Sequence, residues 1–388
     1  MPPWCSCSGC ESEAAPFSSN SITSSGSFRL LTCLSRGVLR ATKLPDWRES
    51  ILGGCIDFVP RVFALSFALL GALPPAARAV GEITVAQQYG VSFLPLMVIE
   101  KNALIQKHTA QAGLPDIKVS WVKVAGPSAM NDGLIANSLH FAAQGAPSMI
   151  TLWDKTRGQI KGVSAMTTYP LYLITRNPAV KSIKDFAAKD KIAVPSIKIS
   201  TQAIMLQMAA SKAFGDKDFA RLDPLTVSLS HPDATLAFTN NTAGVNAHFT
   251  SSPFYEQEIK VPGAHLVTTN YEILGGPATA VLITASSKFR DANPKAYNAF
   301  LEALTEAIDT INKDKRAASQ VYLQAANDTK NSVDDINTMI SDKDYAFTLQ
   351  PQKVLKTAQF MATTGSIKRS PTAISDLFFD DLRGLKGD

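Results

Sequence analysis

The sequence predicts an α/β protein of two lobes, with mainly parallel sheets and two crossing segments that join the lobes. Its 388 residues and 41.6 kDa exceed one small domain and suit two lobes of ordinary size. Apolar residues make up 45% and charged residues 18%, so the chain can bury a core. Strand-like and helix-like segments alternate along it, which favours parallel strands with helices on both faces.

The strands are predicted from β-branched or alternating segments. Residues 118–124 are typical, because polar and apolar side chains alternate as in a half-buried strand. Gly and Pro separate most of these segments from the helices that follow. The expected strands are 83–87, 118–124, 139–143, 191–194, 225–228, 245–249, 265–268 and 279–284.

The helices are predicted from their end signals. Ser200 and Thr201 cap a helix that runs to Phe214 and stops at Gly215. Asn293 and Pro294 begin another, in which apolar residues recur at helical spacing. The other expected helices are 94–112, one opened by 126–128, 182–188, and those begun at Pro232 and Pro253.

The order of these elements predicts an inserted second lobe. A change in pattern near residues 169–174 precedes a new series of strands and helices, and 279–284 returns as a β-rich crossing. Lobe 1 is therefore expected to comprise 80–171 plus 279–388, and lobe 2 to comprise 172–278. We expect hinge motion near 168–175 and 278–284, with a ligand cleft between the lobes.

The beginning of the sequence predicts export. Arg61, an apolar run over 62–73 and Ala77-Arg-Ala79 form a signal-peptide pattern, too short to span a bilayer. A buried helix would not explain the Pro-Pro and small residues that follow. We expect residues 61–79 to be a signal peptide cleaved after Ala79, and the protein to be periplasmic. Residues 1–60 are expected to be a disordered or mis-called N-terminal extension.

The cysteines and the charge exclude several functions. All five cysteines lie at or before Cys55, and Cys5, Cys7 and Cys10 lack a second cluster that could close a tetrahedral metal site. A charged stretch precedes Cys55, so it is not expected to carry a lipid.

The net charge is +5 without a dense basic block, which disfavours nucleic-acid binding. No nucleotide-binding, zinc-protease or nucleophile-elbow motif occurs, and the five histidines are scattered, so neither a cofactor nor a metal is expected.

Four pairs of segments resemble one known family over about residues 82–380. They are 85–90 with 94–95, 126–132 with 141–145, 182–186 with 191–195, and 244–249 with 252–253. The chain resembles substrate-binding proteins of nitrate/sulfonate/taurine (NitT/TauT-type) ABC importers. This resemblance implies a type II periplasmic-binding-protein fold that closes on a small organic or inorganic anion or a heteroaromatic solute. It also implies a monomer that docks on an inner-membrane permease.

In that family the loops after the strands contact the ligand, and the resemblance assigns the same role to these loops here. The implied ligand-binding residues are Gln88, Tyr89, Phe93, Ser128, Ala129, Gly145, Ala146, Ser196, Lys198, Thr201, His248, Phe249 and Thr250. Helix N-termini with Gly or Ser can hold an oxyanion through free N–H groups, and aromatic rings can pack on the body of a ligand. Lys198 could pair with a carboxylate or sulfonate.

Other interpretations of these residues remain open. Ser128 and Thr201 also fit ordinary helix caps, Lys198 a solvated loop lysine, and His248 a packed histidine. An enzyme on the same fold, similar to those of pyrimidine-precursor synthesis, is the alternative function. It would need a cysteine-rich motif, which the chain after residue 79 lacks. A regulator's effector domain is a third option, but no helix-turn-helix precedes the first expected strand.

Overall fold

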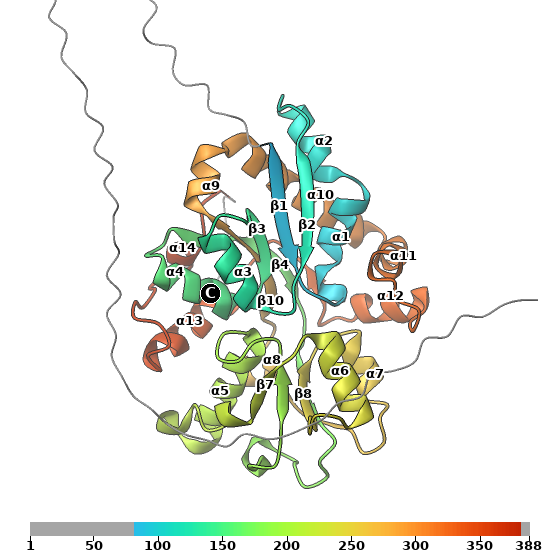
Figure 1. Cartoon of the computed structure of the whole chain (residues 1–388), viewed down its shortest axis with the longest axis vertical. Coiled ribbons are helices and arrows are strands. Elements are labelled where there is room, and N and C mark those ends of the chain that lie inside the picture. Colours follow the sequence, from blue (N-terminus) through green and yellow to red (C-terminus); the bar gives the residue numbers. More distant parts are fainter. Residues whose placement is uncertain (1–80, 382–388) are drawn as a thin grey trace, which may run out of the picture. The chain divides into compact units, whose positions relative to one another are not determined.

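The structure is a computed structural model that describes residues 81–381, which lie within one compact unit. The predicted extension 1–60 and the signal segment 61–79 with its cleavage point fall outside the described residues. Figure 1 shows the arrangement of the elements. In the described part of the chain, no helix combines the length and the apolar character needed to cross a membrane.

Eleven strands and fourteen α-helices occur in the described residues. The strands are β1 Glu82–Gln87, β2 Lys118–Lys123, β3 Phe141–Gln144, β4 Ile160–Thr168, β5 Tyr172–Thr175, β6 Ile192–Val194, β7 Thr226–Ser228, β8 Ala247–Thr250, β9 His265–Thr269, β10 Thr279–Ser286 and β11 Ala346–Phe347. The first seven helices are α1 Leu94–Lys101, α2 Leu104–Gln111, α3 Pro127–Ile135, α4 Ala146–Lys155, α5 Thr201–Phe214, α6 His231–Asn240 and α7 Phe254–Glu258. The others are α8 Asn270–Leu274, α9 Ser287–Ala292, α10 Pro294–Lys313, α11 Lys315–Ala326, α12 Val333–Ser341, α13 Val354–Thr363 and α14 Ile374–Leu377.

The larger sheet has six strands in the order β11-β4-β10-β3-β1-β2. β1 pairs in parallel with β2 and β3, whereas β10 is antiparallel to both β3 and β4. β10 thus lies in the middle of this sheet, although it follows all the strands of the second sheet in the sequence. Helices α1, α2, α10 and α11 pack on one face, and α3, α4 and α13 lie on the other (Figure 1).

The smaller sheet has five strands in the order β7-β6-β8-β5-β9, all drawn from residues 172–269. β6 is parallel to β7 and β8, and β5 is antiparallel to β8 and β9. Leu173 of β5 belongs to the large core on the α5 side, while the next residue, Ile174, packs in a separate cluster with α6. The α/β class is confirmed, but the sheets are mixed rather than mainly parallel.

The sequence did not predict β4, β5 or β11 as strands. β4 is buried along both faces, so its residues do not alternate in polarity and give no strand pattern. It also contains Gly162, where a Cβ would lie 2.5 Å from the Phe378 ring. The glycine is therefore needed for a close approach of the C-terminal segment to the sheet.

Two predicted helices differ in the structure. Residues 94–112 form two helices, because Ala103 takes a left-handed conformation (φ 48°) between α1 and α2. The break lets both pieces pack along α10. Residues 182–188 contain a short 3-10 helix, Ile183–Asp185, which Ser182 and Asp185 close as a capping box.

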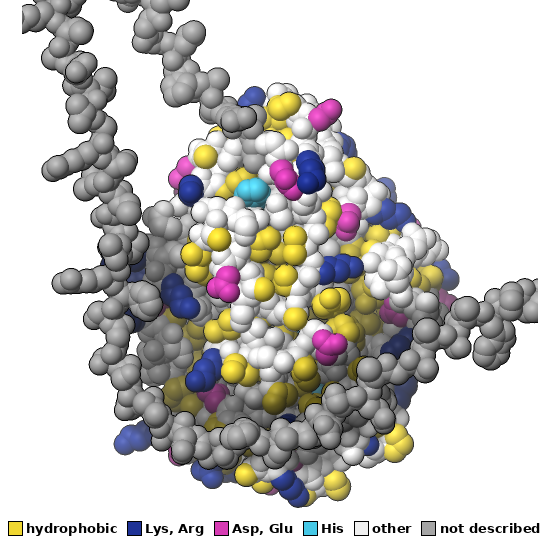
Figure 2. Space-filling view, in the orientation of Figure 1, with side chains coloured by type: hydrophobic (Ala, Val, Ile, Leu, Met, Phe, Trp, Pro, Cys, Tyr) yellow, Lys and Arg dark blue, Asp and Glu magenta, His cyan; other side chains and the backbone are white. Residues whose placement is uncertain are grey.

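Charged side chains are interspersed on the face of the molecule in Figure 2, with Lys and Arg close to Asp and Glu. No basic stripe that could follow a phosphate backbone is visible on this face.

Candidate functional site

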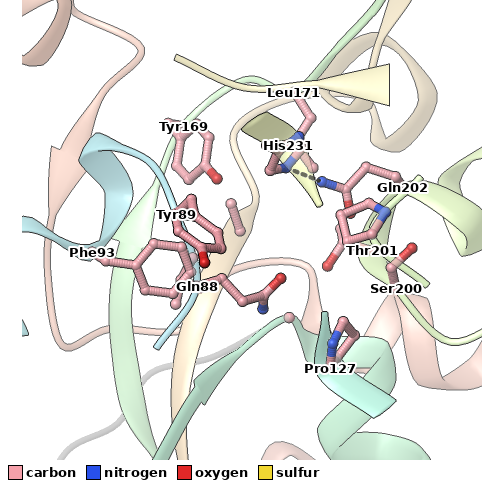
Figure 3. A pocket seen from close by; sticks show the side chains of 14 residues that line it. Gln88, Tyr89, Phe93, Pro127, Tyr169, Leu171, Ser200, Thr201, Gln202 and His231 are labelled. Carbon is pink, nitrogen blue, oxygen red and sulfur yellow. Dashed lines mark hydrogen bonds between the residues drawn. The ribbon is translucent and has the colours of Figure 1, made fainter. Parts of the chain in front are cut away.

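A pocket lies where elements of the two sheets meet, and we call it the central pocket. Its cavity volume is about 30 Å³, room for one or two water molecules. Its lining residues are Gln88, Tyr89, Phe93, Pro127, Gly145, Tyr169, Leu171, Pro195, Ser200, Thr201, Gln202, His231, Ala280 and Val281. In Figure 3, Tyr89 and Phe93 lie on one side of it, and Thr201 and Gln202 lie on the other.

Four helices begin at this pocket. α3 and α4, which pack on the larger sheet, start at Pro127 and directly after Gly145. α5 and α6, which pack on the smaller sheet, start after Ser200 and at His231. The first turn of a helix has N–H groups without helical partners and carries a partial positive charge. Four such ends around one pocket favour an anion, although no Lys or Arg is among its lining residues.

Local sequence positions the two helices of the smaller lobe. The Ser200 hydroxyl accepts from the Ala203 N–H, and the Ser230 hydroxyl accepts from the Asp233 N–H. Each cap satisfies one free N–H and fixes where the helix starts. The caps therefore hold Thr201 and His231 at the first helical position, beside the pocket.

Elements of the two sheets touch directly around the pocket. The Ser128 hydroxyl lies 3.2 Å from the Ser196 hydroxyl, and the Val91 N–H donates to the Ser252 carbonyl at 3.4 Å. A Cβ at residue 126 would lie 2.3 Å from the Pro195 carbonyl oxygen. A Cβ at residue 145 would lie 1.9 Å from Thr201 Oγ1. The close contact between elements of the two sheets thus depends on two positions without side chains.

Buried polar groups give the pocket its chemistry. Gln88, Thr201, Gln202 and His231 are all less than 9% exposed. Burial, with a contribution from His248, holds the pKa of His231 well below its usual value. Burial also raises the pKa of Tyr169 to about 12, so its phenol remains a hydrogen-bond donor. Such a pocket offers neutral donors and acceptors rather than a charged side chain.

The structure places five of the thirteen sequence-predicted residues on the pocket lining: Gln88, Tyr89, Phe93, Gly145 and Thr201. Ser128 and Ser196 form the contact between elements of the two sheets described above. These residues come from segments far apart in the sequence and meet at one place.

The other six predicted residues are not among the lining residues. Ala129 and Lys198 are exposed, and Ala146 and Phe249 belong to the hydrophobic core. His248 is fully buried behind His231, and Thr250 is fully buried on the same strand. β8 is covered by helices on both faces, which keeps the side chains of His248, Phe249 and Thr250 away from the pocket.

Sequence reasoning missed several lining residues, most importantly Tyr169, Gln202 and His231. A signal for His231 was present, because Ser-His-Pro-Asp begins a helix with a cap, and a first-turn histidine faces whatever the helix end faces. Tyr169 lies in the segment that connects the two sheets and carries no comparable local signal. Within residues 81–381, no group of three or more His, Cys, Asp or Glu could hold a metal ion.

Comparison with known proteins gives the class of the fold. No family model matches the chain, and no match was found among the curated proteins. Solved structures do match, and the fold is that of periplasmic binding proteins, as predicted. The Candida albicans CA3427 gene product, which exhibits the generic form of this fold, is 16% identical with a TM-score of 0.51. The match covers 76% of this chain and 93% of that one.

Two further neighbours are sulfonate-binding proteins. The alkanesulfonate-binding protein SsuA from Xanthomonas axonopodis pv. citri, bound to MOPS, is 16% identical with a TM-score of 0.60 over 77% of this chain and 98% of that one. The periplasmic aliphatic sulphonate-binding protein SsuA from Escherichia coli is 15% identical with a TM-score of 0.56 over 78% and 92%. At these identities the likeness shows the fold, and the ligand must be argued from the pocket.

Proposed function

We propose that this protein is the solute-binding component of an ABC importer. It would capture a small anion in the central pocket by closure of the two lobes and deliver it to a membrane permease. The observation that carries this proposal is the meeting of four helix N-termini at a pocket between two sheets. Neutral lining residues suit an anion held by N–H groups and hydroxyls.

The fold supports the same proposal. Several neighbours that share it are named as sulfonate-binding proteins, and one of them binds MOPS, itself a sulfonate. Tyr89, Phe93 and Tyr169 add aromatic surface beside the helix ends, which suits a ligand with an apolar or aromatic body. The aromatic lining therefore favours an organic sulfonate or carboxylate over a bare inorganic ion, provided that opening of the lobes enlarges the pocket.

The organisation of the chain completes the proposal. We take 80–171 plus 279–388 as lobe 1 and 172–278 as lobe 2, with hinge motion near 168–175 and 278–284. Residues 61–79 would direct export to the periplasm and be cleaved after Ala79. The protein would act as a monomer and would not convert its solute.

A ligand screen with a pocket variant tests this function. Small sulfonates, carboxylates, nitrate and heteroaromatic acids are added to the full chain, and the melting temperature is followed. A solute that binds only the folded protein at a hundred times its Kd stabilises it by about 2.7 kcal/mol. Tyr89→Ala should weaken binding of that solute at least tenfold without lowering the melting temperature of the free protein. Tyr89→Phe, which keeps the ring, separates the role of the hydroxyl from that of packing.

Two results would contradict the proposal. If none of these solutes raises the melting temperature, the anion-binding role is wrong. If Tyr89→Ala binds as tightly as the unchanged protein, the central pocket is not the site.

A further inference from the structure

A chain of buried hydrogen bonds leads from a carboxylate to the central pocket. Glu258 Oε1 lies 2.8 Å from His248 Nδ1, and His248 Nε2 lies 3.0 Å from His231 Nδ1. His231 Nε2 in turn lies 3.3 Å from Gln202 Nε2 (Figure 3). Glu258 and His248 are 0% exposed and His231 is 6% exposed. We call Glu258, His248 and His231 the buried relay.

The relay is built from three elements of the smaller lobe. Glu258 is the last residue of α7, His248 lies on β8, and His231 is the first residue of α6. Thr235, one turn along α6, donates its hydroxyl hydrogen to Glu258 Oε1. Phe254 stacks on the His231 ring with centroids 5.5 Å apart, which limits the ring's movement. The imidazoles are therefore held in line between the carboxylate and the pocket.

The carboxylate sets the direction of every hydrogen bond in the relay. When Glu258 is ionised and both imidazoles are neutral, His248 donates from Nδ1 to Glu258, so its Nε2 must accept. His231 then donates from Nδ1 and has a lone pair at Nε2, which accepts from the Gln202 amide. In this state the relay presents an acceptor to the pocket, and an anion gains nothing from it.

One added proton reverses the relay. A proton taken from water binds His231 Nε2, and the proton on His231 Nδ1 passes to His248 Nε2. His248 is then an imidazolium that donates to both neighbours and pairs with the Glu258 carboxylate, and His231 is again neutral. Its Nε2 now carries the hydrogen and can donate to an acceptor in the pocket, and the Gln202 amide no longer donates to it. No electrons are exchanged, and the only change in composition is one bound proton.

We propose that binding of an anion in the central pocket is coupled to the uptake of one proton by the buried relay, with the His231 Nε2–H donating to the anion. This inference rests on the proposed anion-binding function. It identifies His231 as a ligand contact and as a determinant of specificity, because a cationic or donor-only solute would oppose the added proton.

The charges around the relay favour this coupling. Two further carboxylates lie on the elements that carry it, Asp233 on α6 and Glu256 on α7. Burial raises the pKa of Glu256, and the charge of Lys260, which follows α7, acts in the opposite direction. Tyr89 and Tyr169 line the pocket on the other side. Burial, with a contribution from His248, lowers the pKa of His231, which keeps this imidazole neutral in the empty protein at neutral pH.

Calorimetry measures the coupling directly. The full chain is titrated with ethanesulfonate, and with nitrate as a second probe, at pH 7 in buffers with different ionisation enthalpies. The expected result is uptake of about one proton per bound anion and a Kd that rises roughly tenfold for each pH unit above neutrality. His231→Gln, which keeps a polar group at the pocket but cannot exchange a proton, should reduce the uptake to near zero.

Two other variants make the result specific. Glu258→Gln should abolish the uptake, because the imidazolium loses its carboxylate partner; circular dichroism and melting temperature establish that it folds. His265→Gln is the matched control. His265 lies on β9 and contacts two backbone carbonyls away from the relay. Proton uptake by the His265→Gln variant should therefore equal that of the unchanged protein.

The outcomes separate this inference from the function on which it rests. Anion binding without proton uptake in the unchanged protein overturns the relay and leaves the binding function standing. Uptake that persists in His231→Gln also overturns it. Absence of binding by both probes overturns the anion-binding function together with the relay.

Discussion

Two glycines lie where elements of the two sheets make close contact. Gly126 has φ −166° and ψ 175°, and Gly145 has φ −76° and ψ 156°, which are conformations that any residue adopts. Glycine is needed there because of space. A methyl group would overlap the Pro195 carbonyl at one position and the Thr201 hydroxyl at the other. These residues therefore affect closure rather than folding.

Alanine at Gly145 should weaken ligand binding while leaving the fold intact. We expect the Kd to rise at least tenfold and the melting temperature of the free protein to change by less than about 2 °C, because the added methyl group obstructs only the closed cleft. Calorimetric titration with the solute found in the screen measures this. Gly81→Ala is the control, since no atom lies within 4 Å of a Cβ there. Equal affinities for the two variants would show that closure does not bring Gly145 against Thr201.

At the scale of elements, one carboxylate joins three strands of the smaller sheet. Asp190, which precedes β6, accepts hydrogen bonds from Asn177 after β5 and from Asn246 before β8. It also accepts from the Ala187 N–H at 2.8 Å and is 1% exposed. Burial opposes its ionisation, but the three hydrogen bonds outweigh burial and hold the pKa of Asp190 below its usual value.

Replacement of Asp190 by Asn should lower the free energy of unfolding by about 2–4 kcal/mol at pH 7. The pKa of Asp190 is lower in the folded state, so its stabilisation is fully present above the unfolded value of about 3.9 and is lost as the pH falls through the folded value. The difference between variant and unchanged protein should therefore shrink below about pH 4. Urea unfolding at pH 7 and at pH 3.5 measures it, with exposed Asp309→Asn as control. A difference that does not depend on pH would contradict this role.

Elements with local signals could be predicted from the sequence. α5 runs from Thr201 to Phe214 as expected, because the Ser200 cap and Gly215 mark its ends within the chain itself. β4 could not be predicted, since it is buried on both faces and owes its position to β10 and β11. The same distinction applies to the residues that line the pocket. Tyr89 follows a strand end, and Thr201 and His231 begin helices, so the sequence carries a signal for them. Tyr169 lies in the segment between β4 and β5 and lines the pocket only through the fold.

At the scale of the whole molecule, ligand and lobe contact should be linked. The contacts of Ser128 with Ser196 and of Val91 with Ser252 are long hydrogen bonds between the proposed lobes. Tyr271 with the Asp344 carbonyl and Lys356 with the Leu274 carbonyl add two hydrogen bonds of 2.8 Å. A bound anion that contacts helix ends of both lobes would add to them, and binding would select the closed state.

Hydrogen exchange should reveal this linkage. With saturating ligand, we expect amides at the starts of α3, α4, α5 and α6 to become protected at least tenfold, because closure buries these helix ends. α2, none of whose residues lines the cavities that include Tyr89, should exchange at the same rate with and without ligand and serves as the internal control. Protection confined to one lobe would indicate binding without closure.

The central place of β10 has a consequence for biogenesis. β3 and β4 do not pair with each other, and the strand between them arrives only after residues 169–278 have been made. During synthesis or translocation, the N-terminal part of the chain is available first. Until β10 follows, the edges of β3 and β4 with which it will pair remain unpaired. Such edges invite association with other chains. All strands of the smaller sheet can therefore pair before the larger sheet is complete. A nascent chain that ends before Thr279 is expected to require a chaperone or to be degraded.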